Sequence, residues 1–236
     1  MVADAHAAAE FYGTARGAVA ARLIRARLDE IWPDLRGMSV LGIGYTAPYL
    51  RHWRESAGRC IAATPEQIGA ARWPAGVPNL SCTVAEDALP FPDLTFDRIL
   101  LVHGLEAAEH ARRMLREVWR VLKDDGRLLI VAPNRAGMWA HLEHTPFGQG
   151  HPYSSGQIGR LLASSMFHVE HRDTALYLPP TNLRLALRSA RPIERLGRSI
   201  APRFAGVTVT EAVKDLYAAM PITAPARRRL VLAEAA

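Results

Sequence analysis

The sequence predicts an α/β protein built on a doubly wound, mostly parallel sheet. Short apolar runs typical of buried strands alternate with stretches whose apolar residues recur at helical spacing. The first such run, residues 38–43, leads into a glycine turn at Gly42 and Gly44, as a strand does when it opens a ligand site at the carboxyl end of a sheet. The alternation supplies the crossover helices that parallel strands need. We therefore expect one sheet covered by helices on both faces.

The first hundred residues support this fold element by element. Residues 15–31 place apolar side chains on one side of a helix, which Trp32-Pro33 ends because the residue before a proline avoids helical geometry. The predicted strands of this part are residues 38–43, 59–63, 80–84 and 96–102, and the further predicted helices are residues 49–56 and 65–72.

The rest of the chain continues the alternation. The clearest amphipathic helix is residues 107–122, and a turn at Asp124–Gly126 leads to a buried strand at residues 127–132. Residues 134–156 are rich in His, Gly, Pro and aromatic residues, and we expect them to form a functional loop. A helix at residues 155–166 and strands at residues 167–178 and 207–217 follow, with an arginine-rich helical insert between the two strands.

Composition narrows the class of protein. The 236 residues are 49% hydrophobic, enough for a sizeable core, yet no apolar run is long enough to span a membrane. The first residues do not predict a signal peptide, and Cys60 and Cys82 lie in apolar settings typical of buried thiols, so we expect a cytoplasmic location. The net charge of +6 favours anionic partners, although arginines at ordinary surface positions would give the same charge.

A series of short motifs lies between Glu86 and Asn134: Leu89-Pro90-Phe91, then Phe96-Asp97, then Arg120-Val121-Leu122-Lys123, then Gly126-Arg127. Together they make this segment similar to the second half of class I S-adenosylmethionine-dependent methyltransferases of the type 11 group. The resemblance covers residues 36–180. It implies a seven-stranded Rossmann-like methyltransferase fold, S-adenosylmethionine as cofactor and S-adenosylhomocysteine as product.

The resemblance also organises the chain into parts. Residues 1–35 would form an N-terminal helical lid, in which Tyr12 would fold over the cofactor. Residues 36–180 would form the methyltransferase-like core. Residues 181–236 would supply a basic helix and a final strand that complete the same domain.

The segment VLGIGYTAPYL, residues 40–50, is the expected cofactor loop. Gly42 and Gly44 allow a tight turn and a close approach of the backbone to a ligand. Thr46 and Pro48 stand where the family keeps further glycines, and the hydroxyls of Tyr45 and Thr46 are expected to contact the cofactor. The alternative is a strand-to-helix turn that binds nothing.

Acids that the family uses to hold the adenosine are missing. Ala62-Ala63 stands where an acid usually holds the ribose, and Ala85 where an acid usually faces the adenine. Losing one charged hydrogen bond of this kind costs about 1.5–3 kcal/mol. The expected substitutes are Thr64 and Glu66 for the ribose, and Glu86, Asp87 and the adjacent Ala88 for the adenine side.

Methyl transfer depends on aligning a nucleophile with a reactive methyl group, and a base is needed only when the nucleophile holds a proton. His103 follows the strand at residues 96–102, so we expect it at the reaction centre as a base and as a cofactor contact. A packing or capping role is the alternative. In the loop at residues 134–156, His144 and Tyr153 are further catalytic candidates. The histidines of that loop have no cysteine or fixed acid beside them, so no metal is expected.

The insert contains arginines at spacings of four, three, four and three residues, which would place five guanidinium groups on one face of a helix. Pro192 should kink or split that helix, and Glu194 is its one acid. The arginines could meet an acidic protein or a lipid surface; nucleic acid is less favoured because aromatic residues are not interleaved with them. They are Arg184, Arg188, Arg191, Arg195 and Arg198.

Two functions follow from the sequence. The first is an S-adenosylmethionine-dependent methyltransferase that acts on a small-molecule, lipid-like or protein acceptor. The alternative is a catalytically inactive methyltransferase-fold protein that acts as a binding or regulatory partner through its basic helix. Methylation of an RNA base is less favoured, because the residues after the strand at 96–102 do not form the Asn/Asp-Pro-Pro-Tyr type of motif.

Overall fold

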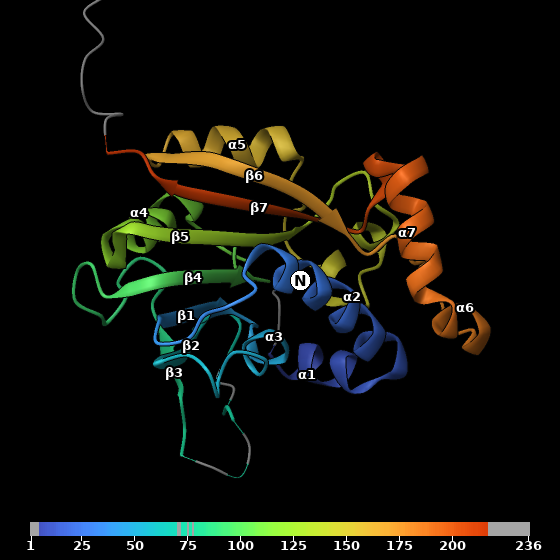
Figure 1. Cartoon of the computed structure of the whole chain (residues 1–236), viewed down its shortest axis with the longest axis horizontal. Helices are drawn as coiled ribbons and strands as arrows, with labels where there is room; N and C mark the ends of the chain where they lie inside the picture. The colour runs from blue at the N-terminus through green and yellow to red at the C-terminus, as the bar shows by residue number, and fades with distance from the viewer. Residues whose placement is uncertain (1–4, 70–71, 75, 77, 217–236) are drawn as a thin grey trace, which may run out of the picture.

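A computed structural model describes residues 5–69, 72–74, 76 and 78–216. One seven-stranded sheet, in the order β3-β2-β1-β4-β5-β7-β6, lies between two layers of helices (Figure 1). The first five strands of the chain pair in parallel, and β7 pairs antiparallel with both β5 and β6. The structure therefore confirms the doubly wound, mostly parallel seven-stranded sheet.

Most strands coincide with apolar runs of the sequence, whereas the edge strand β6 (FHVEHRDTA) is mostly exposed or half-buried. Burial on both faces favours such runs in a parallel sheet, because each strand is covered by helices on both sides. The predicted last strand extended to Tyr217, which lies outside the described residues. The strands are β1 (Ser39–Gly44), β2 (Arg59–Pro65), β3 (Ser81–Val84), β4 (Phe96–Val102), β5 (Leu122–Pro133), β6 (Phe167–Ala175) and β7 (Val207–Lys214).

The helices begin at local sequence signals. Thr14 caps α2, since its hydroxyl accepts a hydrogen bond from the Gly17 N–H, and Ser154 and Gln157 form a capping box at α5. The helices are α1 (Ala5–Gly13), α2 (Ala15–Ile31), α3 (Ala47–Leu50), α4 (Ala111–Val121), α5 (Ser155–Ala163), α6 (Arg184–Arg188) and α7 (Ala190–Ile200), with 3₁₀ turns η1 (Met138–His141), η2 (Pro146–Gly148) and η3 (Pro202–Phe204).

Two hydrophobic cores cover the two faces of the sheet. Successive strand residues point to opposite faces, so Val40 belongs to one core and Leu41 to the other. On the first face, α2 packs Leu23, Ile24 and Leu28 against the sheet. On the second face, α4 and α5 supply residues such as Met114, Leu115, Ile158 and Leu162.

Two predicted helices of the first half are wrong in kind or extent. Residues 65–72 do not form a helix in the described part: Pro65 still belongs to β2, residues 66–68 form turns, and Gly69 has a φ of 92° that a helix does not allow. The helix expected at residues 49–56 is α3, which ends at Leu50 and continues as turns. The turn expected at residues 124–126 is an irregular part of β5.

The arginine-rich insert is two helices, so the single five-arginine face is wrong. The chain breaks between α6 and α7 at Ser189, three residues before the expected site at Pro192. Pro192 lies in the first turn of α7, where its missing N–H leaves no hydrogen bond unmade. Arg198 is not a free cation, because it pairs with Asp173 and Glu30.

Arg120 joins α4 to the Leu89-Pro90-Phe91 corner. Its guanidinium donates to the carbonyl oxygens of Leu89 and Phe91 at 2.9 and 2.8 Å, and it forms ion pairs with Glu117 and Asp93 at 2.7 Å. The Leu89 N–H in turn donates to Glu117. The planar guanidinium presents five N–H donors in a fixed fork and serves all four acceptors, whereas a lysine has three donors on one atom. This network explains why the two motifs occur together.

We predict that Arg120→Ala lowers the free energy of unfolding by about 2 kcal/mol, because two carbonyl groups and two carboxylates lose their donor while water partly replaces it. Arg120→Lys should recover only part of the loss. Arg116→Ala, one turn earlier on the exposed side of α4, is the matched control and should change the stability by less than about 0.5 kcal/mol. Denaturant unfolding measures all three, and equal stability of the two alanine variants would contradict the prediction.

Asp97 connects the beginnings of three strands. Its carboxylate accepts from the Ser39 N–H of β1 at 2.8 Å and from the Lys123 ammonium of β5 at 2.7 Å. Partial burial alone would raise the pKa of Asp97, but the hydrogen bonds from Lys123 and Ser39 and the nearby cations outweigh it and lower the pKa. The ionised form therefore stabilises the fold.

Because the pKa of Asp97 is lower in the folded chain than in the unfolded chain, this stabilisation is complete above the unfolded value and disappears as the pH falls through the folded value. We predict that Asp97→Asn costs about 1–2 kcal/mol at neutral pH. The difference from the wild type should shrink below a pH of about 4. Urea unfolding of both proteins across this pH range tests the prediction. A difference in unfolding free energy that does not change with pH would contradict it.

Candidate active site

The turn after β1 is held tightly against the end of β4. Gly44 has a φ of 93°, and a Cβ there would lie 2.2 Å from the Val102 carbonyl oxygen and 2.8 Å from the Gly104 nitrogen. The Tyr45 N–H donates to the same carbonyl oxygen, with an N···O distance of 2.9 Å. Glycine alone allows both this dihedral and this approach. Gly44 therefore sets how close the loop comes to the residues that follow β4.

Two buried polar atoms beside this turn lack a partner. Gly42 makes room for Thr46, since a Cβ on Gly42 would lie 2.3 Å from the Thr46 hydroxyl oxygen. That hydroxyl and the Oε2 atom of Glu106 are buried and make no hydrogen bond within the described residues. An unsatisfied buried polar group costs about 1–3 kcal/mol. The two atoms are therefore suited to hold a polar ligand.

His103 lies at the end of β4 in a chain of hydrogen bonds. Its Nδ1 atom is 3.1 Å from Glu106 Oε1, and its Nε2 atom is 2.7 Å from the Tyr12 hydroxyl, which is 2.8 Å from the Tyr49 hydroxyl. In the tautomer that carries its proton on Nδ1, this atom donates to Glu106 and Nε2 accepts from Tyr12. Both His103 and Glu106 are buried. The structure thus places a histidine oriented by a carboxylate at the carboxyl end of the sheet.

Helix α1 covers this end of the sheet and brings Tyr12 to His103. The Ala5 N–H donates to the Ile68 carbonyl oxygen after β2, and the Tyr12 ring stacks on Tyr45, with ring centroids 5.6 Å apart. Burial, together with Tyr49 and the charge of Glu106, raises the pKa of the Tyr12 hydroxyl well above its ordinary value. That hydroxyl is therefore protonated at neutral pH and can donate to His103.

The loop after β5 completes an aromatic cluster. Phe147 packs edge-on against His103, with centroids 4.8 Å apart, and also against Phe11 and Trp139.

Tyr153 is half-buried, and burial and the charge of Glu106 raise the pKa of its hydroxyl. His144 is exposed and makes no hydrogen bond or ion pair within the described residues, so the structure does not bring it to His103. No cluster of three metal-ligating side chains occurs among the residues described.

The residues expected on the adenosine side are partly engaged elsewhere. Glu86 is buried and accepts from the N–H groups of Glu109 and His110, just before α4. Asp87 is exposed and pairs with Arg113 at 3.6 Å. Of the others, Thr64 is buried in β2, while Glu66 and Ala88 are exposed.

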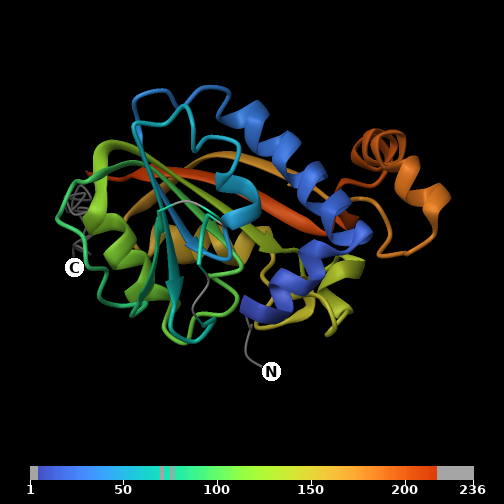
Figure 2. The same cartoon turned by 90° about the horizontal axis from the view of Figure 1, so that it is seen from below.

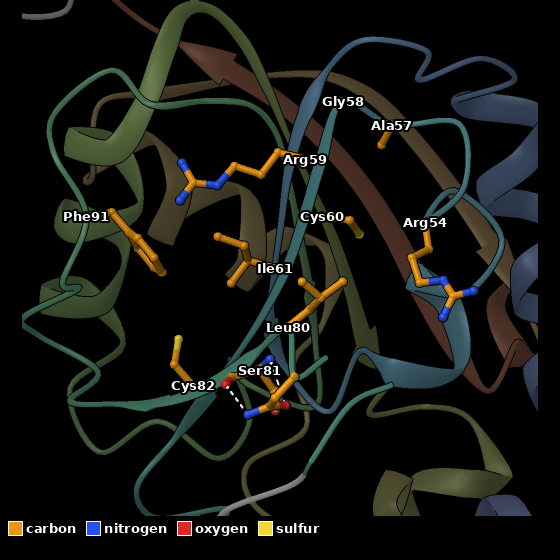
Figure 3. Close-up of a pocket in the computed structure, with 11 residues that line it drawn as sticks. Arg54, Ala57, Gly58, Arg59, Cys60, Ile61, Leu80, Ser81, Cys82 and Phe91 are labelled. Atoms are coloured by element: carbon orange, nitrogen blue, oxygen red, sulfur yellow. Dashed lines mark hydrogen bonds between the residues drawn. The ribbon is translucent and has the colours of Figure 1, made fainter. Parts of the chain in front are cut away.

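A separate hollow of about 510 Å³ lies at the amino-terminal ends of β2 and β3 (Figure 3), away from His103. It is lined by Arg54 and Arg59 and by both cysteines. Burial raises the pKa of Cys60 to about 12 and also raises the pKa of Cys82. Both thiols are free and protonated at neutral pH, which makes them poor nucleophiles.

Sequence comparison gives two findings. Residues 40–130 match the family described as "Methyltransferase domain". A ubiquinone/menaquinone biosynthesis C-methyltransferase of Citrobacter koseri is 49% identical over 45 residues, which is 19% of this chain and 18% of that relative. The chain thus matches less than a fifth of the length of this curated relative.

Structural comparison covers nearly the whole chain. A methyltransferase of Haloferax volcanii, solved in complex with the Trm112 methyltransferase activator, superposes with a TM-score of 0.61 at 18% identity, over 91% of this chain and 99% of that one. A methyltransferase of Thermotoga maritima gives 0.61 at 16% identity, over 87% and 94%. Residues 40–130 therefore resemble a methyltransferase domain, and the chain has the fold of these methyltransferases.

Sequence reasoning placed His103, Tyr12 and the β1 turn at this end of the sheet, but it did not pair Glu106 with His103 and assigned no role to Tyr49. A signal for Glu106 was available, since an acid three residues after a strand-end histidine can reach it across one turn. Tyr49 gave no such signal, because its hydroxyl meets Tyr12 only after α1 packs on the sheet.

We predict that Tyr12→Phe loosens α1, because the variant keeps the ring contacts but loses the hydrogen bonds to His103 and Tyr49. At about 1 kcal/mol for one net hydrogen bond, amide exchange in α1 should accelerate about fivefold. Tyr45→Phe is the matched control, since the Tyr45 hydroxyl makes no hydrogen bond within the described residues. Hydrogen–deuterium exchange measures both, and equal exchange in the two variants would refute a holding role for the Tyr12 hydroxyl.

Proposed function

We propose that this chain is an S-adenosylmethionine-dependent methyltransferase whose acceptor is a small, lipid-like molecule with a removable proton. The observation that carries the proposal is the Tyr12–His103–Glu106 chain beside the β1 turn. The matched C-methyltransferases are named for ubiquinone and menaquinone biosynthesis, which favours a lipid-like acceptor. An aromatic lining that includes Phe147 supports the same choice. A protein acceptor is the second candidate.

The residues around the turn suit the methionine end of the cofactor, which supplies an electrophilic methyl group on a sulfonium. The Thr46 hydroxyl and Glu106 Oε2 would take its polar groups, because both are buried without partners. Aromatic faces attract cations, so Tyr12 and Tyr45 would favour the positive charge. On the ribose side, Thr64 and Glu66 are the polar groups that follow the course of β2.

His103 would act as the base. Its Nε2 atom accepts a proton from the acceptor, while Glu106 holds the ring in position and stabilises the imidazolium that forms. In this structure the Tyr12 hydroxyl is hydrogen-bonded to Nε2. The proton from the acceptor must therefore reach Nε2 through that hydroxyl, or Tyr12 must move aside. The enclosing rings exclude water, which strengthens the attraction between Glu106 and the protonated histidine.

Fold alone does not fix the reaction, because a [4+2]-cyclase, SpnF, superposes with a TM-score of 0.54 at 17% identity. The match of residues 40–130 to a methyltransferase family favours methyl transfer over such a cyclisation. The comparisons give no support to the alternative of a catalytically inactive partner protein. A direct test of binding and of transfer is therefore needed.

The test is calorimetric binding of S-adenosylmethionine, followed by transfer of a labelled methyl group to an extracted lipid fraction. We expect binding in the wild type and in His103→Ala, and loss of transfer in His103→Ala by about 100-fold or more, the usual contribution of a general base. Thr46→Val should weaken binding about tenfold, because one buried hydrogen bond is lost.

The Leu216→Ser variant changes an exposed side chain distant in sequence from the site and serves as a control for both measurements. Absence of binding at millimolar S-adenosylmethionine would reject the proposal. Binding without transfer to lipids, but with transfer to protein fractions, would replace the lipid-like acceptor by a protein.

A further inference from the structure

Helices α6 and α7 expose an unusual amount of apolar surface. Ten large hydrophobic residues are exposed in the described part of the chain, and five of them lie between residues 183 and 204. The exposed fractions reach 77% for Leu185 and 72% for Ile200. Exposed apolar residues that gather in one segment of the chain mark interaction sites more often than scattered ones do. The five are Leu183, Leu185, Leu196, Ile200 and Phe204.

The same helices carry an excess of positive charge. Residues 181–206 contain six arginines and one acid, Glu194. Glu194 is buried and accepts from the N–H groups of Leu176 and Tyr177, so it faces inward and neutralises none of the exposed arginines. Only Arg198 among the six forms an ion pair with a described residue.

An arginine-lined hollow lies where α6 meets α2. Its volume is about 440 Å³, and three arginines are among the residues that line it: Arg22, Arg184 and Arg188. The other lining residues are Ala15, Val19 and Leu187, so no acid contributes. Guanidinium groups bind phosphate oxygens in a planar, bidentate manner. The hollow therefore suits a phosphate group.

The combination of exposed arginines and exposed apolar residues distinguishes a bilayer from a soluble polyanion as the partner. A soluble polyanion such as RNA would use the arginines but would leave Leu196 and Ile200 in water. An anionic bilayer uses both, since arginines meet the headgroups while aliphatic side chains enter the boundary of the acyl region. Helix α7 is amphipathic and short, and no helix in the described part is long and apolar enough to cross a membrane.

We propose that the exposed residues of α6 and α7, together with Arg22, form a docking surface for anionic phospholipid bilayers, with a lipid phosphate in the arginine-lined hollow. Figures 1 and 2 show these helices projecting beside α2, on the same side as the carboxyl ends of the parallel strands. Docking thus brings the end of the sheet that carries His103 to the bilayer. It does not depend on the proposed methyl transfer.

The test is co-sedimentation of the full chain with vesicles of phosphatidylcholine, with and without phosphatidylglycerol. We expect binding to the anionic vesicles to be at least about 100-fold tighter, since each arginine near such a surface contributes about fivefold and three arginines, Arg22, Arg184 and Arg188, line the hollow. This readout needs neither cofactor nor acceptor, so its result is independent of methyl transfer.

Three pairs of substitutions, one of them a control, separate the contributions of charge and of apolar insertion to vesicle binding. Arg188→Ala with Arg195→Ala should weaken binding about 25-fold, at about fivefold for each charge. Arg112→Ala with Arg116→Ala, on α4, removes the same charge from exposed positions elsewhere and should change binding less than about twofold. Leu196→Ser with Ile200→Ser should weaken binding at least about tenfold through lost apolar insertion, and both side chains are already exposed, so the fold is kept.

Absence of binding to the anionic vesicles would overturn the proposal. So would equal effects of the two arginine pairs, which would mean attraction by net charge alone. If the serine pair binds as the wild type does and an RNA oligonucleotide displaces the vesicles, the partner is a soluble polyanion and the bilayer is rejected. Circular dichroism of each variant verifies that the fold is intact.

Discussion

The contact between the β1 turn and the end of β4 is the constraint on which the site depends. Gly44 lets the chain pass close to the Val102 carbonyl oxygen, and Tyr45 bonds to that same oxygen. This contact fixes where the Tyr45 ring lies, and the stacking of Tyr12 on Tyr45 then fixes α1. His103 follows Val102 directly, so the loop, the helix and the histidine are positioned by one close approach.

The site combines an oriented base with a closed, aromatic surrounding. Glu106 holds one nitrogen of His103, and Tyr12 reaches the other from an element that is more than ninety residues away in sequence. The chain lacks the family's usual acids at Ala62 and Ala85, and the nearby Glu86 is committed to the beginning of α4. Among the described residues, buried polar atoms without a partner remain near the β1 turn, at Thr46 and Glu106, and also after β2, at Gln67.

The sheet could be predicted from the sequence because each buried strand leaves an apolar run, and His103 because it follows one. The Tyr12–His103 hydrogen bond could not, because it exists only after α1 has packed on the sheet. The break at Ser189 was missed for a similar reason: Pro192 is the visible helix breaker, yet a proline is harmless in a first turn. The exposure of Leu185 and Leu196 could not be predicted either, since helical spacing alone does not show which face of a helix packs against the rest of the protein.

The two stems of the α6–α7 excursion are fastened at one place. Trp139 donates its indole N–H to the Leu178 carbonyl oxygen before α6, and Asn134 donates to the carbonyl oxygens of Arg203 and Ala205 after α7. Both anchors belong to the loop that also carries Phe147. Both stems are thus held by one loop, while Glu194 and Arg198 fix α7 itself to the end of β6 and to α2. The loop that holds the two stems is therefore the same loop that places the Phe147 ring against His103.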